Sequence, residues 1–208
     1  MEVFTTSSLL NQVADINQTI PKTYDDALRL MHEWVQSESL RKHMLCVSTA
    51  MRAYAKKFGE DEEPWAICGL LHDFDYERYS EYDAEKKTGH PYEGIKVLRE
   101  QGYDERIIEA ILGHALYTNT PRTSLMAKCL FVCDELCGFL VACAYTRPDK
   151  FATLASASVK KKLKNKNFAA KVSREDIDLG IAELGINRDE HIDFVINALR
   201  PIQAEIFA

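Results

Sequence analysis

The longest apolar stretch of the chain, residues 124–145, limits the possible folds more than any other feature. It reads SLMAKCLFVCDELCGFLVACAY, and only Lys128, Asp134 and Glu135 in it are charged. A helix that is apolar on nearly all sides is predicted to lie buried at the centre of a fold. A bare carboxylate on such a helix would be costly. We therefore expect Asp134 to be paired or to bind a ligand, and Glu135 to be exposed or paired with a lysine.

Helical periodicity recurs along the rest of the chain, whereas sustained alternation of apolar and polar residues is nearly absent. The sequence therefore predicts an all-α fold. Capping residues, prolines and glycines place the expected helices at about 23–35, 39–58, 64–72, 91–99, 104–114, 124–145, 174–184 and 188–207, with a short one opening at 158. Residues 1–22 are expected to form a loosely ordered lead-in, and residues 23–208 a single domain.

Length and composition are typical of one globular domain, with 208 residues of which 46% are hydrophobic and 28% are charged. No apolar run reaches the roughly 20 residues that a membrane helix requires. The first residues lack the features of a secretory signal, so the expected location is the cytoplasm. The six cysteines should then be reduced thiols. Cys129, Cys133 and Cys137 form a helical stripe that could bind a soft metal, although small buried side chains are the favoured interpretation.

The charges are unevenly distributed. Eight of the 26 basic residues lie between Lys150 and Arg174, and none of the 32 acidic residues does. An acidic body with one basic segment favours an anionic ligand at that segment rather than general affinity for nucleic acid. Lys160, Lys161 and Lys164 are the candidates for contacts with a substrate phosphate, provided that the segment folds back over the active centre.

The dipeptide His72-Asp73 ends an apolar run, WAICGLL, that a folded domain would bury. An imidazole beside a carboxylate in such surroundings is unfavourable unless something holds both, and a metal ion is a common solution. The pair alone is weak support for a metal site, because the same dipeptide occurs by chance in many proteins.

Further histidines stand where helical spacing expects apolar residues or where a helix begins. His43 lies in the apolar seam of the helix expected at 39–58, His114 follows the seam of the helix at 104–114, and His90 precedes Pro91. Each would ordinarily be a core or surface histidine, as we expect for His32 and His191.

Together with Asp134, the four histidines and Asp73 form a set of nitrogen and oxygen ligands without sulfur. Such a set suits a divalent transition metal such as Fe, Mn, Co, Ni or Zn, and Mg is possible.

The order H…HD…H…H…D on successive helices resembles the HD-domain superfamily of metal-dependent phosphohydrolases, over roughly residues 40–145. The resemblance implies a helical bundle with additional C-terminal helices, here a basic segment at 150–174 followed by helices at 175–207. It also implies that one or two metal ions bind and that Asp73 bridges them. The first ion would be held by His43, His72, Asp73 and Asp134, and the second by Asp73, His90 and His114.

The motif His72-Asp73-Phe74-Asp75 is close to the HDIG variant, but Asp75 replaces its glycine. Tyr76 stands where a branch that cleaves cyclic di-GMP has lysine, and the other signatures of that branch are missing. These departures argue against cyclic di-GMP as the substrate.

The resemblance favours hydrolysis of a nucleotide or another small phosphorylated metabolite by metal-activated water. Asp73 would orient the water, and Asp75 or Glu77 would carry the proton to the leaving oxygen. Two alternatives stay open, an HD-type diiron oxygenase and a non-catalytic module that binds a ligand and contains a structural metal. No membrane and no specific nucleic acid are predicted as partners, and the sequence does not define an oligomeric state.

Overall fold

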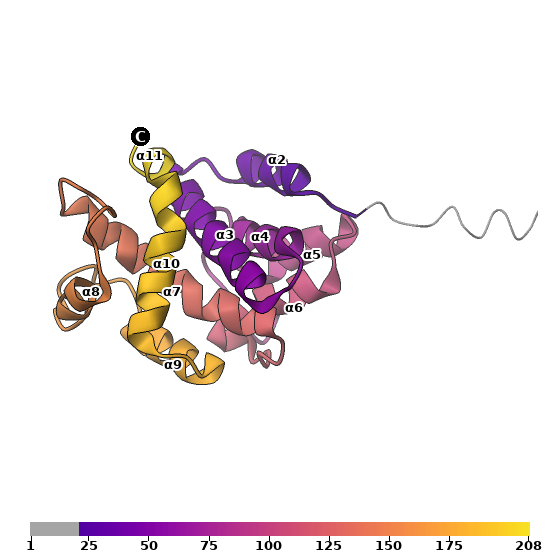
Figure 1. Ribbon diagram of the computed structural model, residues 1–208. Helices are drawn as coiled ribbons and strands as arrows, with labels where there is room; N and C mark the ends of the chain where they lie inside the picture. Colours follow the sequence, from indigo (N-terminus) through magenta and orange to yellow (C-terminus); the bar gives the residue numbers. More distant parts are fainter. Residues whose placement is uncertain (1–20) are drawn as a thin grey trace, which may run out of the picture.

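The computed structural model describes residues 21–208, and this part of the chain is built of helices without a β-sheet (Figure 1). The expected lead-in, residues 1–22, lies almost entirely outside the described residues. The main helices are α2 (Tyr24–Trp34), α3 (Glu38–Phe58), α4 (Glu62–Leu71), α5 (Tyr92–Glu100), α6 (Glu105–His114), α7 (Leu125–Tyr145), α8 (Ser156–Leu163), α9 (Arg174–Leu184), α10 (Arg188–Leu199) and α11 (Gln203–Ile206). The all-α prediction is confirmed.

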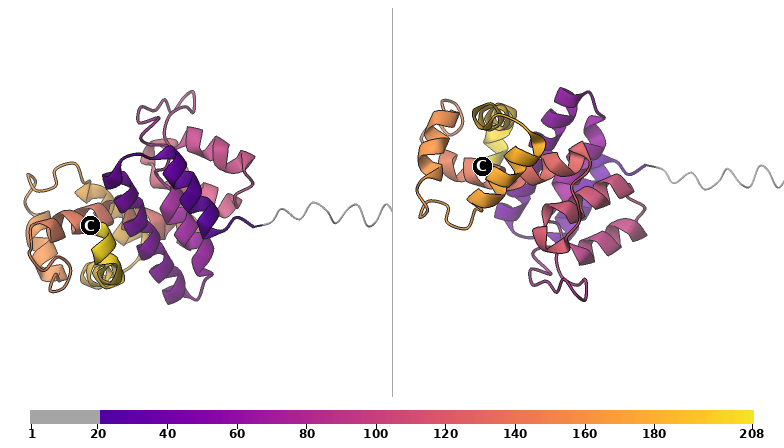
Figure 2. Two further views of the ribbon diagram at one scale, coloured as in Figure 1. Left: turned by 90° about the horizontal axis from the view of Figure 1, so that it is seen from above. Right: turned by 90° about the horizontal axis from the view of Figure 1, so that it is seen from below.

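Helix α7 is the central element, as its sequence predicts. It packs against α3, α4 and α6 and also against α8, α9 and α10. Figure 2 shows the helices from α2 to α6 gathered on one side of α7 and the C-terminal helices on the other. None of the helices in residues 21–208 has the length and apolarity that crossing a membrane requires.

Most helix ends follow the capping signals in the sequence. Thr23 and Asp26 form a capping box at the start of α2, and Gly59 ends α3 in the left-handed conformation, with φ of 72°. The last expected helix, 188–207, is instead interrupted. A short 3₁₀ helix, Arg200–Ile202, separates α10 from α11. Pro201 lies in this segment and has no N–H to donate to the preceding turn.

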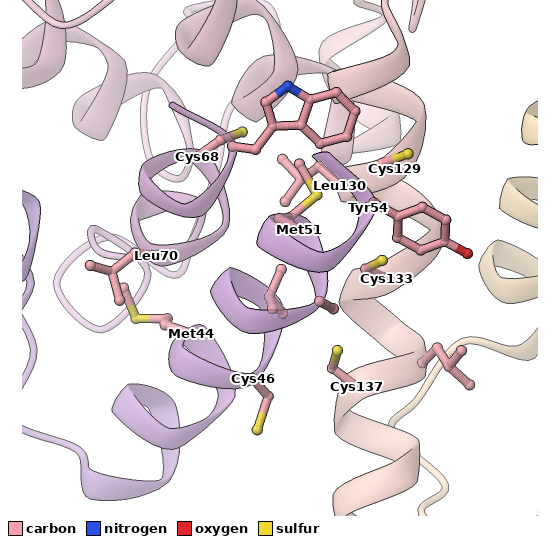
Figure 3. Close-up of a cluster of buried hydrophobic side chains, with 14 of the residues drawn as sticks. Met44, Cys46, Met51, Tyr54, Cys68, Leu70, Cys129, Leu130, Cys133 and Cys137 are labelled. Atoms are coloured by element: carbon pink, nitrogen blue, oxygen red, sulfur yellow. The ribbon is translucent and has the colours of Figure 1, made fainter. Parts of the chain in front are cut away.

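The core between α3 and α7 is rich in sulfur. All six cysteines are buried and free, and Figure 3 shows the thiols of Cys46, Cys133 and Cys137 spread along the interface of the two helices. Within residues 21–208, the groups of side chains placed to bind a metal contain no cysteine. The structure therefore supports the interpretation of the cysteine stripe as small buried side chains.

A glycine sets the distance between α3 and α4. A Cβ atom at Gly69 would lie 2.7 Å from the Cα atom of Ser48, so the two backbones touch. The hydroxyl of Ser48 donates to the carbonyl oxygen of Ala66 at 2.8 Å across the same contact. Because α3 carries His43 and α4 ends at His72, this contact also positions two of the expected metal ligands.

His191 of α10 is a buried structural histidine, 1% exposed. Its Nε2 donates to the carbonyl oxygen of Val132 at 3.2 Å, and its Nδ1 accepts from the hydroxyl of Tyr54 at 2.6 Å. The ring therefore joins α10 to both α7 and α3. Burial lowers the pKa of His191 to about 4.

We predict that Gly69→Ala destabilises the protein by about 1–3 kcal/mol, because the added methyl group must push α3 and α4 apart. Gly138→Ala in α7 is the control, since a Cβ there makes only ordinary contacts. It should be neutral or stabilising by about 0.5–1 kcal/mol. Urea unfolding of both variants checks this, and equal stabilities would contradict the close contact.

We also predict that His191 makes stability fall on acidification. Below its ordinary pKa of 6.5 the unfolded chain takes up a proton that folded His191 refuses until pH reaches about 4. The free energy of unfolding should drop by about 2 kcal/mol between pH 7 and pH 4.5 from this residue alone.

The variant His191→Gln lacks the titrating imidazole and therefore lacks this pH-dependent contribution to the free energy of unfolding. Its stability deficit relative to the wild type should be largest at pH 7 and should shrink by about 2 kcal/mol at pH 4.5. A deficit that is the same at both values of pH would show that His191 does not titrate in this way.

Candidate metal centre

Two groups of candidate metal ligands share one carboxylate. The first consists of His43, His72, Asp73 and Asp134, and the second of Asp73, His90 and His114. The structure thus brings together all six residues that the sequence singles out as metal ligands.

In the first group, the Nε2 atoms of His43 and His72 lie 3.2 Å apart. Oδ1 of Asp134 is 3.0 Å from the former and 3.4 Å from the latter. Oδ2 of Asp73 is 3.3 Å from Nε2 of His72 and 3.8 Å from Nε2 of His43. Four ligand atoms therefore face a common point.

In the second group, the Nε2 atoms of His90 and His114 lie 3.2 Å apart. Each of them is 3.4 Å from Oδ1 of Asp73. The two oxygens of Asp73 thus face different histidine groups, which is the arrangement expected of a bridging carboxylate.

Local hydrogen bonds determine which ring nitrogen of three histidines is free. Nδ1 of His72 donates to the carbonyl oxygen of Gly69 at 2.9 Å, and Nδ1 of His114 donates to that of Ile111. Nδ1 of His90 donates to Oδ1 of Asp75 at 2.7 Å. Each Nε2 is then left with a lone pair that points into the centre, as metal-binding histidines require.

The positions of these residues on the helices explain how they meet. His43 projects from the second turn of α3 and Asp134 from the middle of α7, and these helices pack together. His72 and His114 stand at the C-terminal ends of α4 and α6. Asp73 follows α4 directly, so its side chain reaches into the angle between these helices.

The charges of the group call for a cation. Burial opposes a charge on His72, but the carboxylates of Asp73 and Asp134 raise its pKa well above the ordinary value. Burial likewise opposes ionisation of both aspartates, but the adjacent His72 lowers their pKa values. The carboxylates therefore need positive charge among the imidazoles, which protons or a metal ion can supply. The donor set of imidazole nitrogens and carboxylate oxygens fits a divalent transition metal.

A cavity of about 560 Å³ opens over the centre, and His43, Asp73, His90, His114 and Asp134 line it. Three tyrosines form part of the wall. The rings of Tyr82 and Tyr117 stack with centroids 3.5 Å apart, and Tyr76 meets the ring of His90 edge-on. The candidate ligands therefore lie at the base of a pocket that a small molecule can enter.

Glu135 and Lys171 are two charged pocket residues that the sequence did not single out as candidates. Glu135 is half-buried and lines the cavity, whereas we expected it to be exposed or paired with a lysine. Its carboxylate accepts from the backbone N–H of Ser173 at 3.0 Å. Burial and the neighbouring Asp134 raise the pKa of Glu135 to about 7. Lys171 is the second, and it lines the cavity from the basic segment.

The two candidate proton carriers point away from the pocket. Asp75 is buried and accepts from Nδ1 of His90 and from the backbone N–H of Gly94, each at 2.7 Å. It therefore positions His90. Glu77 accepts from the backbone N–H groups of Gln36 and Ser37, both at 2.9 Å. Both hydrogen bonds lower the pKa of Glu77, and the one from Ser37 has the larger effect.

The three lysines expected at the substrate phosphate lie elsewhere. Lys160 pairs with Asp189 at 2.6 Å, and Lys160 and Lys164 line a separate cavity of about 230 Å³. Lys161 is exposed, and none of the three lines the pocket of the metal centre in the described chain. The basic segment does fold back over the pocket, but it presents Lys171 there.

Comparison with known protein families identifies an HD domain at residues 40–138. This part of the chain is an HD domain, the domain found in a superfamily of metal-dependent phosphohydrolases. The match is to the HD domain in general and does not select the HDIG variant. Comparisons with curated proteins and with solved structures gave no significant match.

We predict that the purified protein binds Mn²⁺ at both ligand groups and that Asp73→Ala loses binding at both, because each group uses one oxygen of Asp73. Asp75→Ala should weaken only the group that contains His90, by about 10–100-fold, since it removes the partner of Nδ1. Calorimetry and elemental analysis measure both effects.

The matched control is Asp83→Ala in the same connection between α4 and α5, where the carboxylate pairs with Lys86 at 2.8 Å. This variant should bind the metal as the wild type does. If Asp73→Ala bound as many Mn²⁺ ions per molecule as the wild type, the two ligand groups would not share this carboxylate.

Proposed function

We propose that this protein is a metal-dependent phosphohydrolase that acts on a nucleotide or another small phosphorylated molecule. The observation that supports this most strongly is the position of Asp73, whose two oxygens face separate histidine groups at the base of a pocket. Divalent ions at these groups would lower the pKa of a bound water and neutralise charge on the phosphoryl oxygens.

The proposed phosphate contact from the protein is Lys171. It borders the pocket from the segment that precedes α9, and it is exposed. Within the described residues its ammonium group takes part in no ion pair with a carboxylate. It can therefore donate a charge-assisted hydrogen bond to a phosphoryl oxygen.

Hydrolysis also requires a proton at the leaving oxygen. Asp75 and Glu77 already accept hydrogen bonds outside the pocket. We assign proton delivery to Glu135 on the basis of its position, because its carboxyl group borders the pocket beside Asp134 and is oriented by the amide of Ser173.

We predict that the Mn²⁺-loaded protein releases inorganic phosphate from p-nitrophenyl phosphate or from nucleoside monophosphates, and that Asp73→Ala abolishes both metal loading and phosphate release. Lys171→Ala should raise KM at least about tenfold, since a hydrogen bond to a charged group contributes about 1.5–3 kcal/mol. Steady-state assays of released phosphate measure both effects.

Lys166→Ala is the matched control, because Lys166 is an exposed lysine of the same segment that does not line this pocket. Its KM should equal that of the wild type. Phosphate release by metal-free Asp73→Ala would contradict the proposal. Consumption of dioxygen by the iron-loaded protein without phosphate release would instead indicate oxygenase chemistry.

A further inference from the structure

Gly138 lies inside α7, and no close packing contact explains why this position is a glycine. Glycine is unfavourable inside a helix unless a close contact requires it. Gly180 of α9 has such a contact, since a Cβ there would lie 2.9 Å from the Cα atom of Val132. At Gly138 the nearest atoms would be Nδ1 of His43 at 3.9 Å and Cγ2 of Val172 at 4.0 Å. A methyl group would fit at Gly138, but a larger side chain would fill the open space beside His43.

Two cavities border this position. The pocket of the metal centre, about 560 Å³, and a second cavity of about 360 Å³ are both lined by His43 and Gly138. The second cavity continues between α3 and α7, away from the metal ligands. The two cavities therefore share a border at which no side chain extends from α7.

The far part of the second cavity has an apolar wall. Val141 and Tyr145 lie one and two turns beyond Gly138 on α7, and Ile206 of α11 is the third apolar residue. Lys42 of α3 stands at the opposite side, where its ammonium group donates to the backbone oxygen of Ala208 at 2.9 Å. The C-terminal turn is thus fastened to α3 beside this cavity.

We propose that the second cavity binds an apolar chain of the substrate, so that the enzyme acts on phosphate esters of alcohols with an extended apolar chain. This inference rests on the proposed function. The phosphoryl group would lie at the metal centre, and the chain would cross Gly138 and contact Val141, Tyr145 and Ile206. Because the two cavities share a border at His43 and Gly138, a ligand at the metal centre is placed to extend into the second one.

The chemistry is ordinary ester hydrolysis. The oxygen of water bonds to phosphorus, the bond between phosphorus and the ester oxygen breaks, and a proton from the water ends on that oxygen. The products are inorganic phosphate and the long-chain alcohol. Burial of the chain adds binding free energy without changing the reacting bonds.

Binding of non-hydrolysable phosphonates tests the inference directly. Octylphosphonate should bind to the full-length, Mn²⁺-loaded protein more tightly than ethylphosphonate, by about fourfold for each methylene group that becomes buried. Isothermal titration calorimetry measures both affinities. Equal affinities would overturn the inference.

Substitutions at Gly138 test whether the preference for the longer phosphonate depends on a chain that crosses this position. Gly138→Leu should reduce the ratio of the two affinities to about one, because its side chain would fill the space at the border of the two cavities. Gly138→Ala should keep the preference for the longer chain. Elemental analysis of both variants checks that the metal centre beside His43 is still loaded. A preference that survives in folded, loaded Gly138→Leu would overturn the proposed route.

A second pair of variants covers the case in which Gly138→Leu does not fold. Val141→Asn places an amide in the apolar wall and should also reduce the ratio to about one. Leu125→Asn is the matched control, because Leu125 is 42% exposed on the same helix and lines neither cavity. An equal loss of preference in both variants would overturn the assignment.

Hydrolysis of ethyl and octyl phosphate separates this inference from the proposed function. Tighter binding of octylphosphonate without phosphate release from either ester would support the chain site and overturn the hydrolase. Phosphate release at equal rates from both esters, together with equal phosphonate affinities, would overturn the chain site and leave the hydrolase standing.

Discussion

The carboxylate of Asp73 is the group on which the metal centre depends. Its two oxygens face two sets of imidazole nitrogens, and three of these rings are held with a lone pair toward the centre. Lone pairs and carboxylates that meet away from bulk water repel one another unless a cation lies among them. A fold that gathers these groups therefore favours a bound metal, and the hydrogen bonds behind the rings orient them for it.

Close backbone packing makes this gathering possible. Gly69 lets α4 touch α3, and the large apolar surface of α7 holds both helices against it. Around the ligands the pocket has a tyrosine wall, and at Gly138 it borders a second, partly apolar cavity.

Some of the six candidate ligands could be predicted because a polar residue in an apolar seam stands out from its neighbours, and the resemblance to the HD-domain superfamily completed the set. His43 and Asp134 are the clearest cases. Glu135 and Lys171 carried no such signal, since a charged residue beside a ligand or in a lysine-rich segment is ordinary. The orientation of the Asp75 side chain could not be predicted either, because it depends on hydrogen bonds with His90 and Gly94 rather than on sequence spacing.

The amino-acid sequence by itself determined the helices, the central place of α7 and the residue types of the metal centre, because local periodicity and capping record these directly. Only the tertiary structure decided which lysine faces the pocket. Lys160 and Lys171 belong to one basic segment, but the first pairs with Asp189 on α10. The second lies within a turn that Arg174 holds through the carbonyl oxygens of Ala169 and Val172. Such contacts join residues whose partners no local pattern specifies, so they arise only when the helices pack.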